Sequence, residues 1–80
     1  MITQPYQLCI ERIDASRNMA RYYALSIEPT LFGKASLVRR WGRIGTFGQQ
    51  KIQLFDNEAG AIDAFHALLR EKRARGYRTR

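Results

Sequence analysis

Residues 56–76 read DNEAGAIDAFHALLREKRARG, and this stretch decides the fold because it predicts one long amphipathic helix. Its apolar positions recur at helical spacing on one face, and they are Ala61, Ile62, Phe65, Leu68, Leu69 and the stem of Lys72. Asp56 is suited to be the N-cap, and Gly76 is suited to end the helix after a basic last turn. An apolar stripe on one side only indicates a helix that packs across a sheet.

The residues before this helix predict a meander of four strands. Residues 6–13 alternate between apolar and polar side chains, residues 14–18 form a turn, and residues 19–27 predict a second, hairpin-linked strand. Residues 35–41 favour a strand but do not alternate cleanly, which indicates a twisted or bulged strand. Residues 50–55 alternate as the fourth strand. We therefore expect an α+β fold over residues 1–80, a single domain with its core at about 6–78, in which one long helix packs across a small antiparallel sheet of about four to five strands.

The composition limits the kind of protein this chain can form. A chain that is 45% hydrophobic and 11% aromatic is globular. The single cysteine, Cys9, has no companion for a disulfide or a zinc site, and no apolar stretch is long enough to span a membrane. His66 lacks the partners of a catalytic base, and Asp56 and Asp63 read as helix-end charges. We expect a cytoplasmic protein that is not an enzyme, with no metal, no cofactor and no small-molecule substrate.

The net charge of +7 is concentrated in two blocks. Between Glu28 and Asp56 there is no acidic residue, whereas Lys34, Arg39, Arg40, Arg43 and Lys51 are all basic. A second basic block covers residues 70–80. Such clustering is typical of proteins that bind polyanions, although a solvated basic surface explains the charge equally well.

Residues 41–49 read WGRIGTFGQ and place one indole, one guanidinium and three glycines around a short turn. The indole of Trp41 offers a flat face to a sugar or base, and Arg43 offers a fork of donors to a phosphate. The alternative is that Trp41 covers the core and that the glycines only form turns. The spacing of the glycines does not indicate a nucleotide-binding loop, because no helix N-terminus follows it.

This pattern resembles the WGR domain, a family named for the tripeptide Trp41-Gly42-Arg43. The matching residues outside the tripeptide are Tyr22, Tyr23, Ala24, Leu25, Arg40, Gly45, Gly48, Gln49, Phe55, Ala61, Phe65, Lys72, Gly76 and Tyr77. The family is found beside the catalytic region of DNA-dependent poly(ADP-ribose) polymerases and as short bacterial proteins, and this chain is similar to a short stand-alone bacterial member. The resemblance implies that Trp41 stacks on nucleic acid and that Arg43 either contacts the backbone or braces a neighbouring domain.

These observations predict a non-enzymatic nucleic-acid-binding module, with DNA as the expected ligand. The expected interface consists of Lys34, Arg39, Arg40, Trp41, Arg43 and Lys51. Two alternatives remain open at this point. One is a protein-protein interaction adaptor with an acidic partner, and the other is an accessory subunit of a DNA-processing enzyme.

Overall fold

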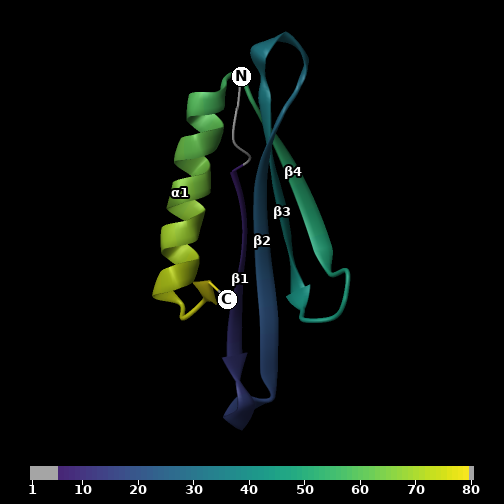
Figure 1. The fold of residues 1–80 in the computed structure, drawn as a ribbon, viewed down its shortest axis with the longest axis vertical. Helices are drawn as coiled ribbons and strands as arrows, with labels where there is room; N and C mark the ends of the chain where they lie inside the picture. The colour runs from purple at the N-terminus through teal and green to yellow at the C-terminus, as the bar shows by residue number, and fades with distance from the viewer. Residues whose placement is uncertain (1–5, 80) are drawn as a thin grey trace.

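The computed structural model describes residues 6–79 and shows a five-stranded antiparallel sheet with one helix along one of its faces (Figure 1). In chain order the elements are β1 (Tyr6–Asp14), the 3₁₀ turn η1 (Ala15–Arg17), β2 (Met19–Pro29), the 3₁₀ turn η2 (Leu31–Gly33), β3 (Ala35–Arg43), β4 (Gln49–Phe55), α1 (Glu58–Ala74) and β5 (Arg78–Thr79). The strand order is β4-β3-β2-β1-β5. The predicted α+β architecture is confirmed, and β5 is a short fifth strand paired with β1.

The core lies between α1 and one face of the sheet, which we call the covered face. The sheet contributes alternate residues to it, because successive side chains of a strand point to opposite sides. The buried core residues are Ile10, Tyr23, Leu25, Ile27, Ala35, Leu37, Ala61, Phe65 and Tyr77. Ile62, Leu68 and Leu69 pack against this cluster, which confirms the predicted helix stripe. The opposite side of the sheet, with Cys9, Ala24, Val38 and Ile52, is the open face.

The N-terminus of α1 differs from the prediction by one residue, whereas its C-terminus lies where the sequence predicts it. The N-cap is Asn57, whose backbone is extended and whose Oδ1 accepts a hydrogen bond from the Gly60 amide at 2.9 Å. The prediction of Asp56 as N-cap is wrong by one residue, because the amide of Asn57 caps as well as a carboxylate does. At the other end Gly76 has a φ of +97°, and the Gly76 and Tyr77 amides donate to the Arg73 and Lys72 carbonyls. Gly76 therefore ends the helix as predicted.

β3 is a regular strand, and the bulge considered for it is wrong. Its pairing is unbroken on both sides, from Pro29–Ala35 to Arg21–Arg43 along β2 and from Ala35–Phe55 to Trp41–Gln49 along β4. The neighbouring apolar residues Leu37 and Val38 fit this regularity because Leu37 faces the helix and Val38 is half-buried on the open face. Residues 39, 41 and 43 consequently share the covered face with Leu37.

Candidate nucleic-acid interface

Three arginines lie side by side on adjacent strands of the covered face. Arg12 of β1 is paired with Arg21 of β2, and Arg21 is paired with Arg43 of β3. The row lies at the C-terminal end of α1, where Arg12 approaches Gly76. Like charges directly opposite one another on neighbouring strands destabilise a sheet. The fold thus concentrates positive charge here at a cost in stability, which is typical of a site for an anion.

An aromatic row lies next to the arginines. Tyr23 is paired with Trp41, and their ring centroids are 6.2 Å apart at an angle of 32°. The Lys72 Nζ, from the last turn of α1, lies 4.6 Å from the Tyr23 centroid and 5.9 Å from that of Tyr77. Trp41 is half-buried and packs against the core while still lining the surface. It therefore combines both expectations, part core residue and part accessible ring.

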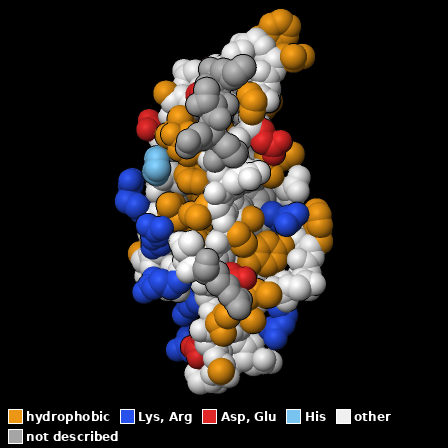
Figure 2. Space-filling model, in the orientation of Figure 1, with side chains coloured by type: hydrophobic (Ala, Val, Ile, Leu, Met, Phe, Trp, Pro, Cys, Tyr) orange, Lys and Arg blue, Asp and Glu red, His pale blue; other side chains and the backbone are white. Residues whose placement is uncertain are grey.

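The arginine row and the aromatic row form the wall of one open cavity of about 640 Å³, which we call the basic cavity. Its cationic lining residues come from all parts of the chain and are Arg12, Arg17, Arg21, Arg39, Arg43, Lys72 and Arg75. Figure 2 shows that Lys and Arg side chains gather over the lower half of the molecule, most of them on the side where α1 lies. The cavity can accept a polyanion beside a flat aromatic surface.

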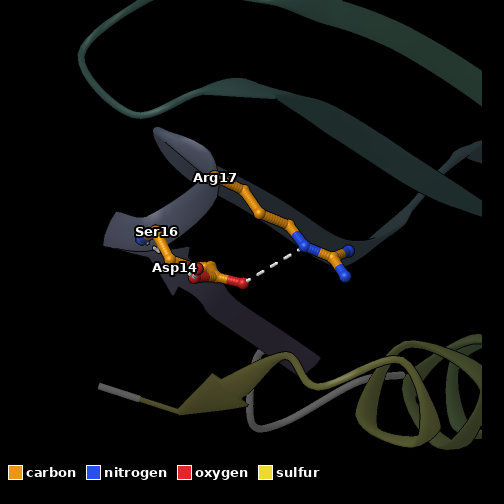
Figure 3. Close-up of polar contacts among 3 residues, drawn as sticks. All are labelled: Asp14, Ser16 and Arg17. Atoms are coloured by element: carbon orange, nitrogen blue, oxygen red, sulfur yellow. Dashed lines mark hydrogen bonds and ion pairs between the residues drawn. The ribbon is translucent and has the colours of Figure 1, made fainter.

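Within residues 6–79, Arg17 and Arg75 of the basic cavity form ion pairs with acidic residues. The Arg17 Nε lies 3.7 Å from Asp14 Oδ2, and Arg75 Nη2 lies 3.5 Å from Glu71 Oε1. Figure 3 shows Arg17 reaching from the η1 turn toward Asp14, which also accepts hydrogen bonds from the Ser16 amide and hydroxyl. Exposed ion pairs of this kind contribute little stability. They hold side chains at the rim of the basic cavity and leave its excess positive charge in place.

Arg39 and Tyr23 lie deeper in the basic cavity. The Arg39 Nε atom is buried and has no hydrogen-bond partner among residues 6–79. Such a donor is costly to bury and is more typical of a binding site than of a packed core. Burial raises the pKa of the Tyr23 phenol, and the nearby positive charge of Arg39 opposes that rise in part. Tyr23 is therefore a neutral hydroxyl at physiological pH.

The loop of residues 44–48 fixes the backbone of Trp41 from the open face. The Tyr22 hydroxyl donates to the Phe47 carbonyl, and Gly48 packs against the Trp41 carbonyl. Gly48 has a φ of +72°, and a Cβ there would lie 2.1 Å from the Trp41 carbonyl oxygen. A Cβ on Gly42 would lie 2.9 Å from the Gly48 Cα. These two glycines serve close packing and turn formation.

Only some of the interface residues expected from the sequence lie at the basic cavity. Arg39, Trp41 and Arg43 all line the basic cavity. Lys51 lies beside Arg39 on β4, since the two residues are register partners. Arg40 points to the open face, where its guanidinium carbon lies 5.0 Å from the Phe47 ring centroid.

Lys34 lies apart from all of these residues. It follows η2 in the β2–β3 connection, at the opposite end of a molecule 47 Å long (Figure 1).

Sequence reasoning missed four of the cavity residues: Arg12, Arg17, Arg21 and Tyr77. Lys72 and Arg75 belong to the second basic block, residues 70–80, which the sequence analysis noted but did not include in the expected interface. The charges of residues 1–28 cancel in sum, and that sum hid the arginines of β1 and β2. Alternation offers the signal that could have found them. Arg12 continues the covered-face series after Leu8 and Ile10, and Arg21 precedes Tyr23 and Leu25 in the series of β2.

Residues 6–79 contain no group of three or more His, Cys, Asp or Glu side chains placed to hold a metal ion. Their one long helix, α1, is too short and too polar to cross a membrane.

The fold and the basic cavity define a small α+β domain with a cationic, aromatic-lined site at one end of its sheet. Comparison with known families identifies it: the model of the WGR domain matches residues 6–80. The chain belongs to the WGR domain family, a family of nucleic-acid-binding type.

A curated relative supports this membership. The chain is 61% identical over 80 residues to the uncharacterized protein y4dW of Sinorhizobium fredii (strain NBRC 101917 / NGR234). The match covers all of this chain and 39% of that relative, so the chain spans about two fifths of the relative's length.

Proposed function

We propose that the chain is a non-enzymatic module that binds nucleic acid, with DNA as its ligand. The backbone phosphates occupy the basic cavity, and Trp41 packs against a sugar or base. The observation that carries this proposal is the row of Arg12, Arg21 and Arg43 on three adjacent strands, next to the Trp41 ring. A phosphate between these guanidiniums relieves their mutual repulsion and accepts paired hydrogen bonds from them.

The cavity offers backbone contacts and no means to distinguish bases. Its polar lining consists mainly of cations, which fix the register of a phosphate backbone without reading sequence. Stacking on an aromatic ring is also tolerant of sequence, because every base and sugar presents a face. We therefore expect similar affinities for unrelated sequences of one length.

An adaptor function is the second candidate, and one observation favours it. At the end of the molecule far from the basic cavity, Leu31 and Phe32 are 77% and 94% exposed. Exposed apolar side chains at a loop tip are suited to contact another protein. An adaptor of this kind, whose basic surface would contact an acidic partner, would bind that protein more tightly than it binds duplex DNA. An accessory subunit of a DNA-processing enzyme would instead bind the enzyme.

The affinity for a duplex should depend steeply on salt. If about four cavity cations contact phosphates, log K should fall against log salt with a slope of about −3 to −4. Titration of a labelled blunt duplex at several salt concentrations measures this slope, and single-stranded DNA and RNA of equal length give the comparison. A slope near zero would exclude binding through phosphates and favour the adaptor.

Substitution of Arg21 tests whether the basic cavity is the binding site. Arg21→Gln should weaken duplex binding by about 1.5 kcal/mol, roughly tenfold, and make the salt slope less negative by about 1. Lys34→Gln removes one charge at the far end of the molecule and is the matched control. Since charges beyond about 8 Å are screened at physiological salt, we expect it to change the affinity by less than about twofold. Equal losses in the two variants would contradict a site in the cavity.

A further inference from the structure

The strand β4 forms one edge of the sheet, and its outer backbone is not paired with any other part of residues 6–79. Figure 1 shows β4 at the border of the sheet away from α1. Six of its seven residues are exposed, from Gln49 to Leu54. An exposed edge of this length presents a row of free N–H and C=O groups that can pair with another strand.

This edge lacks the features that usually protect an edge strand from pairing. The sequence QQKIQLF contains no proline and no glycine, and its only charged residue is Lys51. The unbroken register with β3 shows that no bulge twists the strand away. Ile52 and Leu54 are 56% and 68% exposed, and both lie on the open face beside β3. Edges with exposed aliphatic residues and few charges are prone to pair.

We propose that β4 of one copy pairs antiparallel with β4 of a second copy about a two-fold axis at Ile52. In this register Ile52 lies opposite Ile52 of the second copy, and Leu54 lies opposite its Gln50. Lys51 lies opposite Gln53 of the second copy, so the two lysines do not face each other. The two sheets join into one continuous sheet, and the interface is the same patch on both copies.

The pattern of β4 favours a second copy over a different extended peptide. Around Ile52 the strand is self-complementary, because its aliphatic side chains meet aliphatic or amide partners and its single cation meets an amide. The strand offers only Lys51 to an acidic peptide, while most of the domain's cations lie elsewhere. Apolar and amide side chains give the second copy a better match than an acidic strand would have.

The interface is small, which predicts a reversible dimer. A seven-residue strand is about 23 Å long, and such an edge buries less than the roughly 800 Å² per partner of a typical stable complex. We expect a Kd on the order of 100 µM. Each copy carries a net charge of +7, so added salt should strengthen the dimer by screening repulsion. Nucleic-acid binding should weaken as salt is added, whereas dimer formation should strengthen. The two proposals can therefore be tested independently of each other.

Sedimentation velocity over about 10 µM to 1 mM, a range that brackets the expected Kd, should show a monomer–dimer equilibrium at high salt. Ile52→Lys places two charges at the two-fold axis and should raise the Kd at least about tenfold. Ile13→Lys is the matched control, since Ile13 is 60% exposed on the open face of β1 and lies away from β4. It should leave the Kd within about twofold. A wild-type protein that stays monomeric throughout, or equal effects of the two variants, would overturn the proposal.

Cross-linking tests the register itself. In a Cys9→Ser background, Ile52→Cys brings the two new thiols opposite each other, with Cβ atoms about 4.5–5.5 Å apart. Leu54→Cys places its thiols four residues apart along the paired strands, about 13 Å. Mild oxidation should link the Ile52→Cys variant at least about tenfold faster, because its Cβ atoms need to approach by only about 1 Å to reach the 3.5–4.5 Å of a disulfide, whereas those of Leu54→Cys are about 9 Å too far apart. Leu54 is the more exposed of the two residues, so equal or faster linking there would refute this register.

Discussion

Replacement of Phe65 with alanine is expected to lower the free energy of unfolding by about 3–5 kcal/mol. Phe65 is 5% exposed and joins α1 to the sheet, with its ring centroid 5.7 Å from that of Tyr6. The loss combines the removed apolar contacts with the cavity left behind, and it approaches the whole stability of a domain this small. Urea unfolding followed by circular dichroism measures the change.

Phe32→Ala removes the same ring from a solvent-exposed position and provides the control. Phe32 is 94% exposed, so its replacement should change the free energy of unfolding by less than about 0.5 kcal/mol. If the Phe65→Ala variant unfolded at the wild-type midpoint, α1 would not pack on the sheet through Phe65.

Replacement of Trp41 with alanine should weaken duplex binding by about 1–3 kcal/mol, roughly fivefold to 150-fold. The ring lines the basic cavity next to Arg43 and is the flat surface available to a sugar or base. Because Trp41 is half-buried against Tyr23, we also expect a loss of stability, smaller than that of Phe65→Ala. Affinity and circular dichroism should be measured on the same preparation, well below the melting temperature.

Trp41→Phe keeps an aromatic face of smaller area and should retain part of the lost affinity. A folded Trp41→Ala variant with wild-type affinity would show that the ring does not contact the ligand. A variant that fails to fold while Trp41→Phe folds and binds normally would assign Trp41 to the core alone.

The sequence predicted the fold well where the signal is local. The stripe through Phe65 needs only helical spacing, and the alternation of β1 and β2 needs only a period of two. β5 has two residues, too few to show a period, and it forms because Gly76 turns the chain back toward β1. The bulge considered for β3 was wrong because burial on both sides of the sheet interrupts the simple pattern.

Of the residues that line the basic cavity, the sequence grouped only those carried by β3. Arg39, Trp41 and Arg43 are close in the chain and share a face of β3, so the sequence could group them. The same alternation sends Arg40 to the open face.

The other cavity residues depend on distant parts of the chain. Arg12 and Arg21 meet only through the register of a hairpin, and Lys72 arrives through the packing of α1. Alternation could have placed Arg12 and Arg21 on the covered face, but it does not give the strand pairing that brings them opposite each other. Spacing along the chain also does not give the position of the helix on the sheet.

The close approach of Gly48 to Gly42 shows that the three residues Trp41, Gly42 and Arg43 contact different parts of the domain on the two sides of β3. The first and third letters face the basic cavity, whereas the middle letter faces a loop that crosses the other side of the strand. The tripeptide therefore meets two separate structural requirements in three consecutive positions. Under the proposed function, a relative that kept the glycine but changed Trp41 or Arg43 would keep the loop packing and lose contacts to nucleic acid. A relative that had a larger residue in place of Gly42 would need a different conformation of the loop of residues 44–48, because a Cβ there would collide with Gly48.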